Sequence, residues 1–289
     1  MSGLCVMING LRGRMGQEIL AVCSGRGMAL SPFALEGPGC PDSIEVSLPS
    51  GNATVALAQP GDAARKALES AKADAASRGL TLIAIDFTHP TAVNGNCDLY
   101  SALQVPFVLG TTGGDREALM RVVKTSGVRA VIAPNMCKQI VALQAMLKSM
   151  AEQYPGSFDG YSLHVKESHQ TKKADTSGTA KAFVAHWNDL RGKEEKPLEH
   201  KDIIKVRSKE EQRELGVPED ALGGHAWHTY TLTSSDGSTQ FALTHNICGR
   251  RTYAEGVADA VAFLYGKIAA ASEQRLFDMI DVLKEGAMS

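Results

Sequence analysis

Long apolar runs and massed charge of one sign are both absent from this sequence. No run of about 18 apolar residues occurs, so a membrane-spanning helix is not expected. The formal net charge is −2, and the 30 lysines and arginines are scattered along the chain. A nucleic-acid partner is therefore not expected either, because such proteins concentrate their basic residues in one patch or segment.

Cysteine is scarce, and its spacing does not suggest zinc. The six cysteines include no C-x-x-C pair and no nearby Cys/His set, so no structural metal is expected. Most of them lie in apolar surroundings, which predicts reduced thiols in a reducing compartment. The chain enters an apolar strand at Leu4, so no signal or transit peptide is expected in this sequence.

What the sequence does contain is typical of a soluble chain of about two domains: 289 residues, 44% of them hydrophobic and 21% charged. An apolar run at Leu4–Ile8 predicts a buried parallel strand. Gly10, Gly13 and Gly16 follow, and a helix pattern begins at Gln17. Strand, glycine loop and helix in this order predict a dinucleotide site, with the pyrophosphate at the helix N-terminus. A glycine loop without a ligand is the alternative.

Glu36 ends the next predicted strand, Ser31–Leu35, about twenty positions after Gly16. An acid at this place accepts hydrogen bonds from the adenosine ribose and disfavours a 2′-phosphate, so it favours NADH over NADPH. Arg12 and Arg14 could still reach a 2′-phosphate from the glycine loop. Alternatively, Glu36 is an acid at a strand end with no ligand.

Three more buried strands are predicted in the first half, and each ends in a loop of small or polar residues. They are Leu80–Ile85, Val105–Leu109 and Val128–Ile132. Ligands of open α/β sheets bind at the carboxyl ends of the strands, so these loops are expected to line a nicotinamide site. Each loop taken alone is equally consistent with ordinary turn chemistry.

The pattern changes after a helix predicted over Gln139–Gln153. The charged stretch Arg191–Glu214 is expected to be solvated surface. Strands now dominate, and they are predicted at residues 161–166, 203–206, 226–233 and 239–245.

Residues 253–285 are helical in pattern and are expected to return to the first domain. The predicted fold is α/β. It comprises a Rossmann-type, doubly wound parallel-sheet domain formed by residues 1–137 and 251–289. Residues 138–250 are expected to form an inserted α+β domain with a mixed open sheet.

The segment 167–180 carries the residues best suited to chemistry. It is predicted to be a loop between a strand and an amphipathic helix, with Thr176 or Ser177 as the N-cap. The helix N-terminus and the lysine pair 172–173 predict binding of an anionic small molecule. His169 could move a proton near neutral pH. A solvated loop that merely caps a helix is the alternative.

Three motifs together resemble the dihydrodipicolinate reductase family, the hydroxytetrahydrodipicolinate reductases of the diaminopimelate route to lysine. They are Gly10-x-x-Gly13-Arg14-Met15-Gly16, Gly110-Thr111-Thr112-Gly113 and Glu167-x-His169-x-x-x-Lys173-x-Asp175-x-Ser177-Gly178-Thr179-Ala180. The resemblance covers essentially the whole chain. Gln170 stands where the family's loop has a second histidine, and the proline before Ser177 is absent. Both departures resemble the branch found in plants.

The resemblance implies a dinucleotide site in the first domain and a carboxylate-binding loop in the second. The residues expected to hold the dinucleotide and line its nicotinamide side are Gly10, Gly13, Arg14, Met15, Glu36, Phe87, Thr88, Gly110, Thr111, Thr112, Pro134, Asn135 and Met136. Those expected to hold a substrate carboxylate are Lys173, Ser177, Gly178 and Thr179, with Gln170 nearby. His169 and Lys173 are expected to supply the proton that meets hydride addition.

The resemblance further implies reduction of a small dicarboxylate by NADH or NADPH, without a metal, in a homotetramer built through the sheet of the second domain. A bacterial chain of this kind would be cytoplasmic, and one from a photosynthetic eukaryote would lie in the plastid stroma. Two alternatives stand beside this interpretation. A related amino- or imino-acid dehydrogenase would not need the Lys-x-Asp-x-Ser-Gly-Thr loop, and a non-catalytic dinucleotide sensor would have no use for His169 and Lys173.

Overall fold

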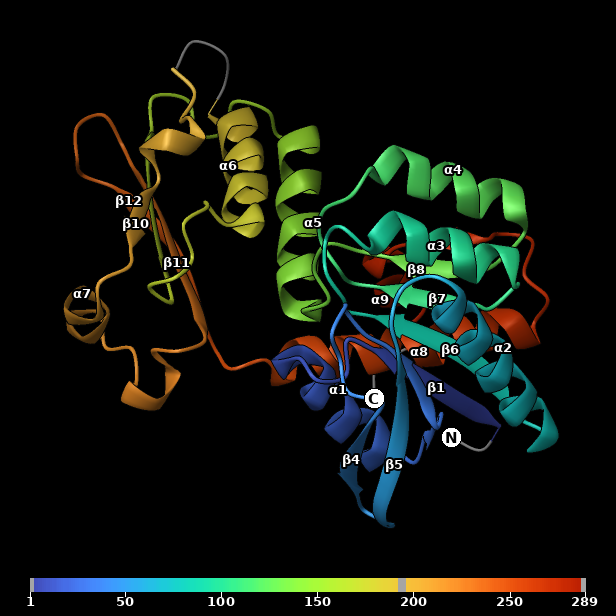
Figure 1. Ribbon diagram of the computed structural model, residues 1–289. Helices are drawn as coiled ribbons and strands as arrows, with labels where there is room; N and C mark the ends of the chain where they lie inside the picture. Colours follow the sequence, from blue (N-terminus) through green and yellow to red (C-terminus); the bar gives the residue numbers. More distant parts are fainter. Residues whose placement is uncertain (1–2, 192–195, 287–289) are drawn as a thin grey trace. The chain divides into compact units, whose positions relative to one another are not determined.

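The computed structural model describes residues 3–191 and 196–286, and the chain divides into two compact units. One unit comprises Met1–Lys138 together with Arg251–Ser289, and the other comprises Gln139–Arg250 (Figure 1). The first unit contains two sheets and the second contains one, and each unit has its own helices.

A six-stranded, wholly parallel sheet forms the centre of the first unit, in the order β13-β8-β7-β6-β1-β2. Its strands are β1 (Leu4–Asn9), β2 (Ala29–Leu30), β6 (Thr81–Asp86), β7 (Phe107–Leu109), β8 (Ala130–Ile132) and β13 (Leu276–Phe277). The middle strands are buried along almost their whole length because helices cover both faces. The predicted doubly wound, Rossmann-type architecture is confirmed.

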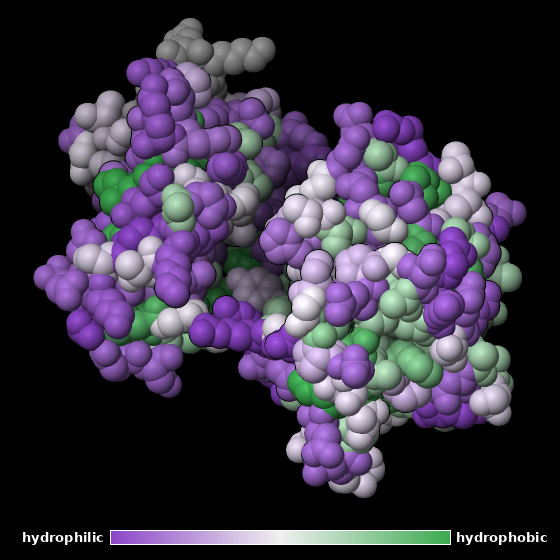
Figure 2. Space-filling model, viewed as in Figure 1, coloured by the Kyte–Doolittle hydropathy of each residue, from purple (hydrophilic) through white to green (hydrophobic). Residues whose placement is uncertain are grey.

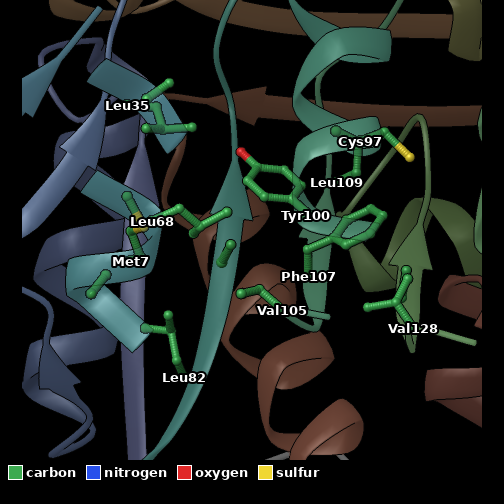
Figure 3. Close-up of a cluster of buried hydrophobic side chains, with 14 of the residues drawn as sticks. Met7, Leu35, Leu68, Leu82, Cys97, Tyr100, Val105, Phe107, Leu109 and Val128 are labelled. Atoms are coloured by element: carbon green, nitrogen blue, oxygen red, sulfur yellow. The ribbon is translucent and has the colours of Figure 1, made fainter. Parts of the chain in front are cut away.

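One face of this sheet is covered by α2 (Asp62–Ser77), α3 (Val93–Ala102) and α4 (Arg116–Ser126). Figure 3 shows the core they form, in which Leu68 and Tyr100 lie among the sheet residues. The rings of Tyr100 and Phe107 are 5.1 Å apart. On the other face α1 (Arg14–Gly25) packs against α8 (Arg251–Ala269), and α9 (Met279–Lys284) packs against α8.

The strand predicted over Ser31–Leu35 is in fact split between two sheets. Ser31 still donates its N–H to the carbonyl of Val6 in the main sheet, 2.9 Å away. Pro32 has no N–H to continue that ladder, and its carbonyl instead accepts the N–H of Ala56 at 2.8 Å. The chain thereby joins a separate three-stranded sheet, ordered β3 (Phe33–Leu35), β5 (Gly51–Ala58) and β4 (Ser43–Leu48).

The continuous helical segment predicted for residues 253–285 is also wrong in its middle. Helix α8 ends at Ala269, and Ala271 takes a left-handed conformation with φ of 50°. The chain then adds β13 to the edge of the main sheet beside β8 before α9 begins. Leu276 and Phe277 supply that strand, so a short edge strand was hidden within a helical pattern.

The second unit is built on a four-stranded mixed sheet in the order β10-β9-β11-β12. The strands are β9 (Ser162–His169), β10 (Ile204–Val206), β11 (His225–Thr233) and β12 (Gln240–Cys248), and the helices are α5 (Lys138–Gln153), α6 (Gly178–Leu190) and α7 (Lys209–Glu214). The mixed open sheet predicted for the inserted domain is confirmed. The charged stretch 191–214 contains β10 and α7, and residues 192–195 of it lie outside the described residues.

Strand β9 runs three residues further than the strand predicted from the sequence. Glu167, Ser168 and His169 pair with residues 226–228 of β11, and β10 flanks the same end of β9. These three residues were predicted to open a loop, and the structure places them in the interior of a sheet instead. Their backbone and side chains are therefore held rigidly.

None of the helices in the described ranges is both long and apolar enough to cross a bilayer. The face of the molecule in Figure 2 is mainly hydrophilic, with small hydrophobic areas scattered over it.

Candidate functional site

The glycine loop after β1 is tightly folded on itself. Gly10 has a φ of 78° and donates its N–H to the carbonyl of Leu35, 2.9 Å away. The N–H of Gly13 donates to the carbonyl of Gly10 at 3.0 Å. Arg14 and Met15 then begin α1, with Arg14 exposed and Met15 half-buried. The loop leads directly into the N-terminus of α1, with Gly13 as its N-cap, and an anionic ligand could bind there.

Gly16 gives the first prediction, because a Cβ atom there would lie 2.3 Å from the carbonyl oxygen of Gly10. Gly16→Ala should distort the loop and lower the free energy of unfolding by about 1–3 kcal/mol. It should also weaken NADH binding by about tenfold or more. The matched control is Gly25→Ala in the same helix, where a Cβ would meet nothing within 4 Å. Fluorescence titration with NADH tests this, and equal affinities for the two variants would contradict it.

Glu36 lines a cavity of about 960 Å³ within the first unit. One of its carboxylate oxygens accepts the backbone N–H of Arg12 at 2.8 Å, so the acid is fixed to the glycine loop. Five of the predicted cofactor residues line this cavity, namely Gly10, Gly13, Glu36, Phe87 and Thr88. Residues far apart in the sequence are thus brought together around one space large enough for part of a dinucleotide.

Asp86 is the residue that organises these loops, and the sequence analysis missed it. It is fully buried at the carboxyl end of β6. Its two carboxylate oxygens accept hydrogen bonds at 2.7–2.9 Å from the hydroxyls of Thr88, Thr111 and Tyr100 and from the amide of Asn96. A strand-end aspartate followed by polar loops was the available signal.

The loop after β7 is also hydrogen-bonded to Asp86. The N–H groups of Gly110 and Thr111 both donate to the carbonyl of Asp86, at 3.1 and 3.2 Å. A Cβ on Gly110 would lie 2.1 Å from the ring of Phe87, so a larger residue at this position would require that ring to move. Thr112, the next residue, is exposed.

The loop after β8 lies in close contact with helix α8. Pro134 is exposed and Asn135 accepts the N–H of Cys137 on its side-chain oxygen at 2.8 Å. Met136 is buried, and a Cβ at Gly256 of α8 would come within 1.7 Å of its carbonyl oxygen. Glycine at that position of α8 allows the helix to approach the loop, a requirement that no local pattern in the sequence revealed.

His169 lies at the end of β9 in the second unit and is only 6% exposed. Its Nδ1 is 3.1 Å from the carbonyl of His225, and its Nε2 is 3.0 Å from Nε2 of His228. The sequence analysis missed His228, which is 1% exposed on the neighbouring strand.

Burial lowers the pKa of His169 to about 4, and the positive charges of Arg207 and Lys173 act in the same direction. The imidazole is therefore neutral at pH 7 in the free protein. The role expected for His169, moving a proton near neutral pH, stays a prediction. Burial also lowers the pKa of His228 well below its ordinary value, with His245 and His169 contributing.

The loop that follows β9 is fastened to the sheet by a buried ion pair that the sequence analysis missed. The guanidinium of Arg207 contacts the carboxylate of Glu167, which is completely buried. The guanidinium also donates to the carbonyls of Lys173 (2.7 Å) and Asp175 (3.3 Å). The other carboxylate oxygen of Glu167 accepts the N–H of Ser177 at 3.0 Å. Two charged groups thus fix the path of residues 170–177.

The predicted carboxylate-binding residues lie along this fastened loop. Lys173 is partly exposed and donates to the exposed carboxylate of Asp175 at 2.8 Å. Ser177 is the N-cap of α6, although its side chain makes no capping hydrogen bond, and Gly178 and Thr179 form the first turn of that helix. Gln170 lies just after β9 and is half-buried.

Glu167, His169 and His228 could share a metal ion by distance, since their ligand atoms lie within 4.8 Å of one another. These atoms are already engaged, because Glu167 pairs with Arg207 and the two rings contact each other. The guanidinium also opposes a second cation there. The cluster fits a hydrogen-bonded pair of neutral rings better, and we assign no metal to it.

Models of known protein families match both units of the chain. The model of the dihydrodipicolinate reductase N-terminus matches residues 4–136, and that of the C-terminus matches residues 139–283. The chain belongs to the dihydrodipicolinate reductase family. The resemblance drawn from the three motifs is thereby confirmed.

Two relatives illustrate the range of this reductase family. The chain is 42% identical over 288 residues to "4-hydroxy-tetrahydrodipicolinate reductase 1, chloroplastic" of Arabidopsis thaliana, covering 99% of this chain and 80% of that protein. It is 30% identical over 281 residues to the 4-hydroxy-tetrahydrodipicolinate reductase of Thiobacillus denitrificans, covering 96% and 97%. The structure of dipicolinate-bound dihydrodipicolinate reductase from Paenisporosarcina sp. TG-14 shares the fold, with a TM-score of 0.60 at 22% identity over 95% of this chain and 97% of that one.

Proposed function

We propose that this chain reduces hydroxytetrahydrodipicolinate to tetrahydrodipicolinate, taking hydride from a reduced nicotinamide and a proton through His169 and Lys173. Its family makes it an NAD(P)H-dependent reductase of the diaminopimelate route of lysine biosynthesis. The observation that carries the residue assignment is the fastened loop 170–177. It holds Lys173 and the start of α6 in fixed positions directly after His169.

The reaction needs both a hydride and a proton. Hydride added to the conjugated imine of the substrate pushes an electron pair toward the ring nitrogen and its neighbouring carbon, and the substrate loses its hydroxyl as water along the path. A proton donor must meet that electron pair. His169, with the ammonium of Lys173 near it, is the donor we assign, and a clamped carboxylate would fix the ring relative to it.

The dinucleotide would occupy the first unit. Gly10, Gly13, Arg14 and Met15 would hold its phosphates and Glu36 its adenosine ribose. The cavity beside Glu36 and the close approach of Gly10 to the loop after β6 support this. The nicotinamide side would be lined by Phe87, Thr88, Gly110, Thr111, Thr112, Pro134, Asn135 and Met136.

Cofactor preference gives the second prediction. Glu36 favours NADH, because its carboxylate would accept hydrogen bonds from the ribose and repel a 2′-phosphate. Glu36→Ala should lower kcat/KM for NADH by about tenfold and change the value for NADPH much less. Glu45→Ala, at an exposed acid of β4, is the matched control. An unchanged NADH-to-NADPH ratio in Glu36→Ala would contradict the assignment.

The substrate would bind in the second unit as a dicarboxylate. Lys173 would hold one carboxylate with the first-turn groups Ser177, Gly178 and Thr179, and Gln170 would lie nearby. A relative of the same fold was solved with dipicolinate bound, and we propose that this dicarboxylate also binds here. The helix N-terminus and the ammonium group are both suited to an anion.

Dipicolinate binding tests this assignment and gives the third prediction. Lys173→Ala should weaken dipicolinate binding by about tenfold or more, the loss expected for one charged hydrogen bond, while NADH binding is unchanged. Lys172→Ala changes an adjacent, exposed lysine and should alter dipicolinate binding less than threefold, as a weak surface interaction would. Calorimetric titration measures both, and equal losses in the two variants would contradict the assignment.

We further propose a homotetramer formed through the sheet of the second unit. Strand β12 is the edge of that sheet, largely exposed, and Phe241 on it is 49% exposed. An exposed nine-residue edge strand is a natural site for pairing or covering by another copy.

For location we propose the bacterial cytoplasm or the plastid stroma, in line with bacterial and chloroplastic relatives. No metal, nucleic acid or membrane is part of the proposal.

A further inference from the structure

Four aromatic side chains with titratable groups lie together on three adjacent strands of the second unit. They are His169 on β9, His228 and Tyr230 on β11 and His245 on β12. His228 and Tyr230 are 1% and 0% exposed. The rings of His228 and His245 are 4.6 Å apart, and Phe183 of α6 stacks on Tyr230 at 4.8 Å. The proposed reaction has so far used only His169 of this group.

The hydrogen bonds fix where the protons lie in the free protein. A carbonyl can only accept, so Nδ1 of His169, 3.1 Å from the carbonyl of His225, must carry a proton and donate it. Because this ring is neutral, its Nε2 is a bare acceptor. Nε2 of His228, 3.0 Å away, must then be the donor. Nδ1 of His228 in turn accepts from the hydroxyl of Tyr230 at 3.0 Å.

This arrangement leaves the neutral His169 with no proton to give, since its only N–H is bound to a backbone carbonyl. His169 can carry a second proton, on Nε2, only if Nε2 of His228 becomes an acceptor. His228 must then hold its own proton on Nδ1, where the oxygen of Tyr230 can accept it, because a hydroxyl both donates and accepts. The pair can therefore hold one extra proton while every ring nitrogen keeps a partner.

The charges around the pair decide when it takes that proton. Arg207 and Lys173 oppose it, as does burial, and His245 opposes it on the side of His228. Glu167, with a carboxylate oxygen 4.0 Å from Nε2 of His169, is the only acid in contact with the pair among the described residues, and Arg207 already neutralises it. A bound dicarboxylate would add the missing negative charge. An opposite charge within about 4–6 Å shifts a pKa by about 1–3 units.

We propose that His228, backed by Tyr230, is a positioning residue through which His169 takes up one proton from solvent when the dicarboxylate substrate binds. The extra proton is held on Nε2 of His169 against Nε2 of His228. After hydride transfer His169 gives it to the reduced ring, and the pair returns to its neutral arrangement. The inference rests on the proposed function, because it takes the ligand of this loop to be a dicarboxylate.

Proton uptake on ligand binding tests the inference without turnover. Dipicolinate would be titrated into the full chain at pH 6.0 by calorimetry, in two buffers of different ionisation enthalpy. With the pKa raised from about 4 by about 2 units, the middle of the range of about 1–3 units, the wild-type protein should take up about half a proton per dipicolinate bound. His228→Leu should bind dipicolinate within about threefold but lose most of this uptake. His164→Gln, at an exposed histidine of β9, should keep it.

Two further variants keep the test decisive if His228→Leu does not fold. Tyr230→Phe preserves the ring stacked on Phe183 and removes only the oxygen, so uptake should fall with the fold intact. His228→Gln can turn its amide to donate or accept and should keep uptake near the wild-type value. Equal uptake in wild type and Tyr230→Phe would overturn the inference, as would dipicolinate binding to wild type without uptake. No dipicolinate binding at all would overturn the proposed function and this inference with it.

Discussion

Replacing His169 with alanine is expected to lower kcat by about 10²–10⁴, the usual contribution of a general acid. Of the imidazoles that lie near it in the described residues, His228 faces His169 itself and His225 is bound to Ala221 and Ser168, so neither is placed to substitute for it. The KM for the nicotinamide cofactor should not change, since the proposed dinucleotide residues all lie in the first unit. Steady-state kinetics over a range of cofactor and substrate concentrations separates these effects.

The control for this experiment is His164→Gln. It removes an exposed imidazole from the same strand, five residues before His169, and should leave kcat within about twofold, as expected for a surface site. Dipicolinate should still bind to His169→Ala, because Lys173 and the start of α6 are retained. A kcat for His169→Ala within tenfold of wild type would refute the role assigned to His169.

Glu167→Ala is expected to lower the free energy of unfolding by about 3–5 kcal/mol, the range for breaking a buried ion pair from one side. The side chain of Arg207, 17% exposed in the wild-type protein, would keep carbonyl oxygens as partners but would have no carboxylate to balance its charge. The N–H of Ser177 would also lose its acceptor. Loop 170–177 would then be free to move, so dipicolinate affinity should fall together with stability. Urea unfolding and calorimetric titration measure the two quantities.

Two comparisons show whether the buried pair is responsible. Glu152→Ala removes the acid of an exposed pair in the same unit, where Lys148 lies 3.8 Å away, and should change stability by less than about 1 kcal/mol. The double variant Glu167→Gln, Arg207→Met replaces the pair by neutral groups and should regain much of the stability lost in Glu167→Ala. A double variant no more stable than Glu167→Ala would contradict this explanation.

Features set by neighbouring residues could be predicted from the sequence. The glycine loop, the buried strands and the helix predicted over Gln139–Gln153 each carry a local pattern, and the predicted strands of the first half form the parallel sheet. The prediction of one strand at Ser31–Leu35 was wrong because Pro32 moves the chain from one sheet to another. That change of sheet depends on where Val6 and Ala56 lie. The prediction of helix at residues 270–277 was wrong because an edge strand of two residues is too short to show a period in the sequence.

The chemical state of the site depended on contacts that sequence spacing cannot show. His169 looked like a loop residue, and only its pairing with β11 reveals that it is buried beside His228. Arg207 lies 40 positions after Glu167, and neither residue alone indicates that they meet. The motif identified the family, because the sequence of Glu167–Ala180 is specific to it. It could not predict the lowered pKa of His169, which arises from burial and from the charges of Arg207 and Lys173.

The most direct test of the central claim is oxidation of NADH and NADPH, measured in parallel, by the purified chain. The unstable substrate would be generated in situ from pyruvate and aspartate semialdehyde by the synthase that precedes this step. The account predicts cofactor oxidation that requires the synthase, is faster with NADH and is lost by a large factor in His169→Ala. Tight cofactor binding with no synthase-dependent oxidation would contradict it, and would favour a dinucleotide sensor or a related dehydrogenase instead.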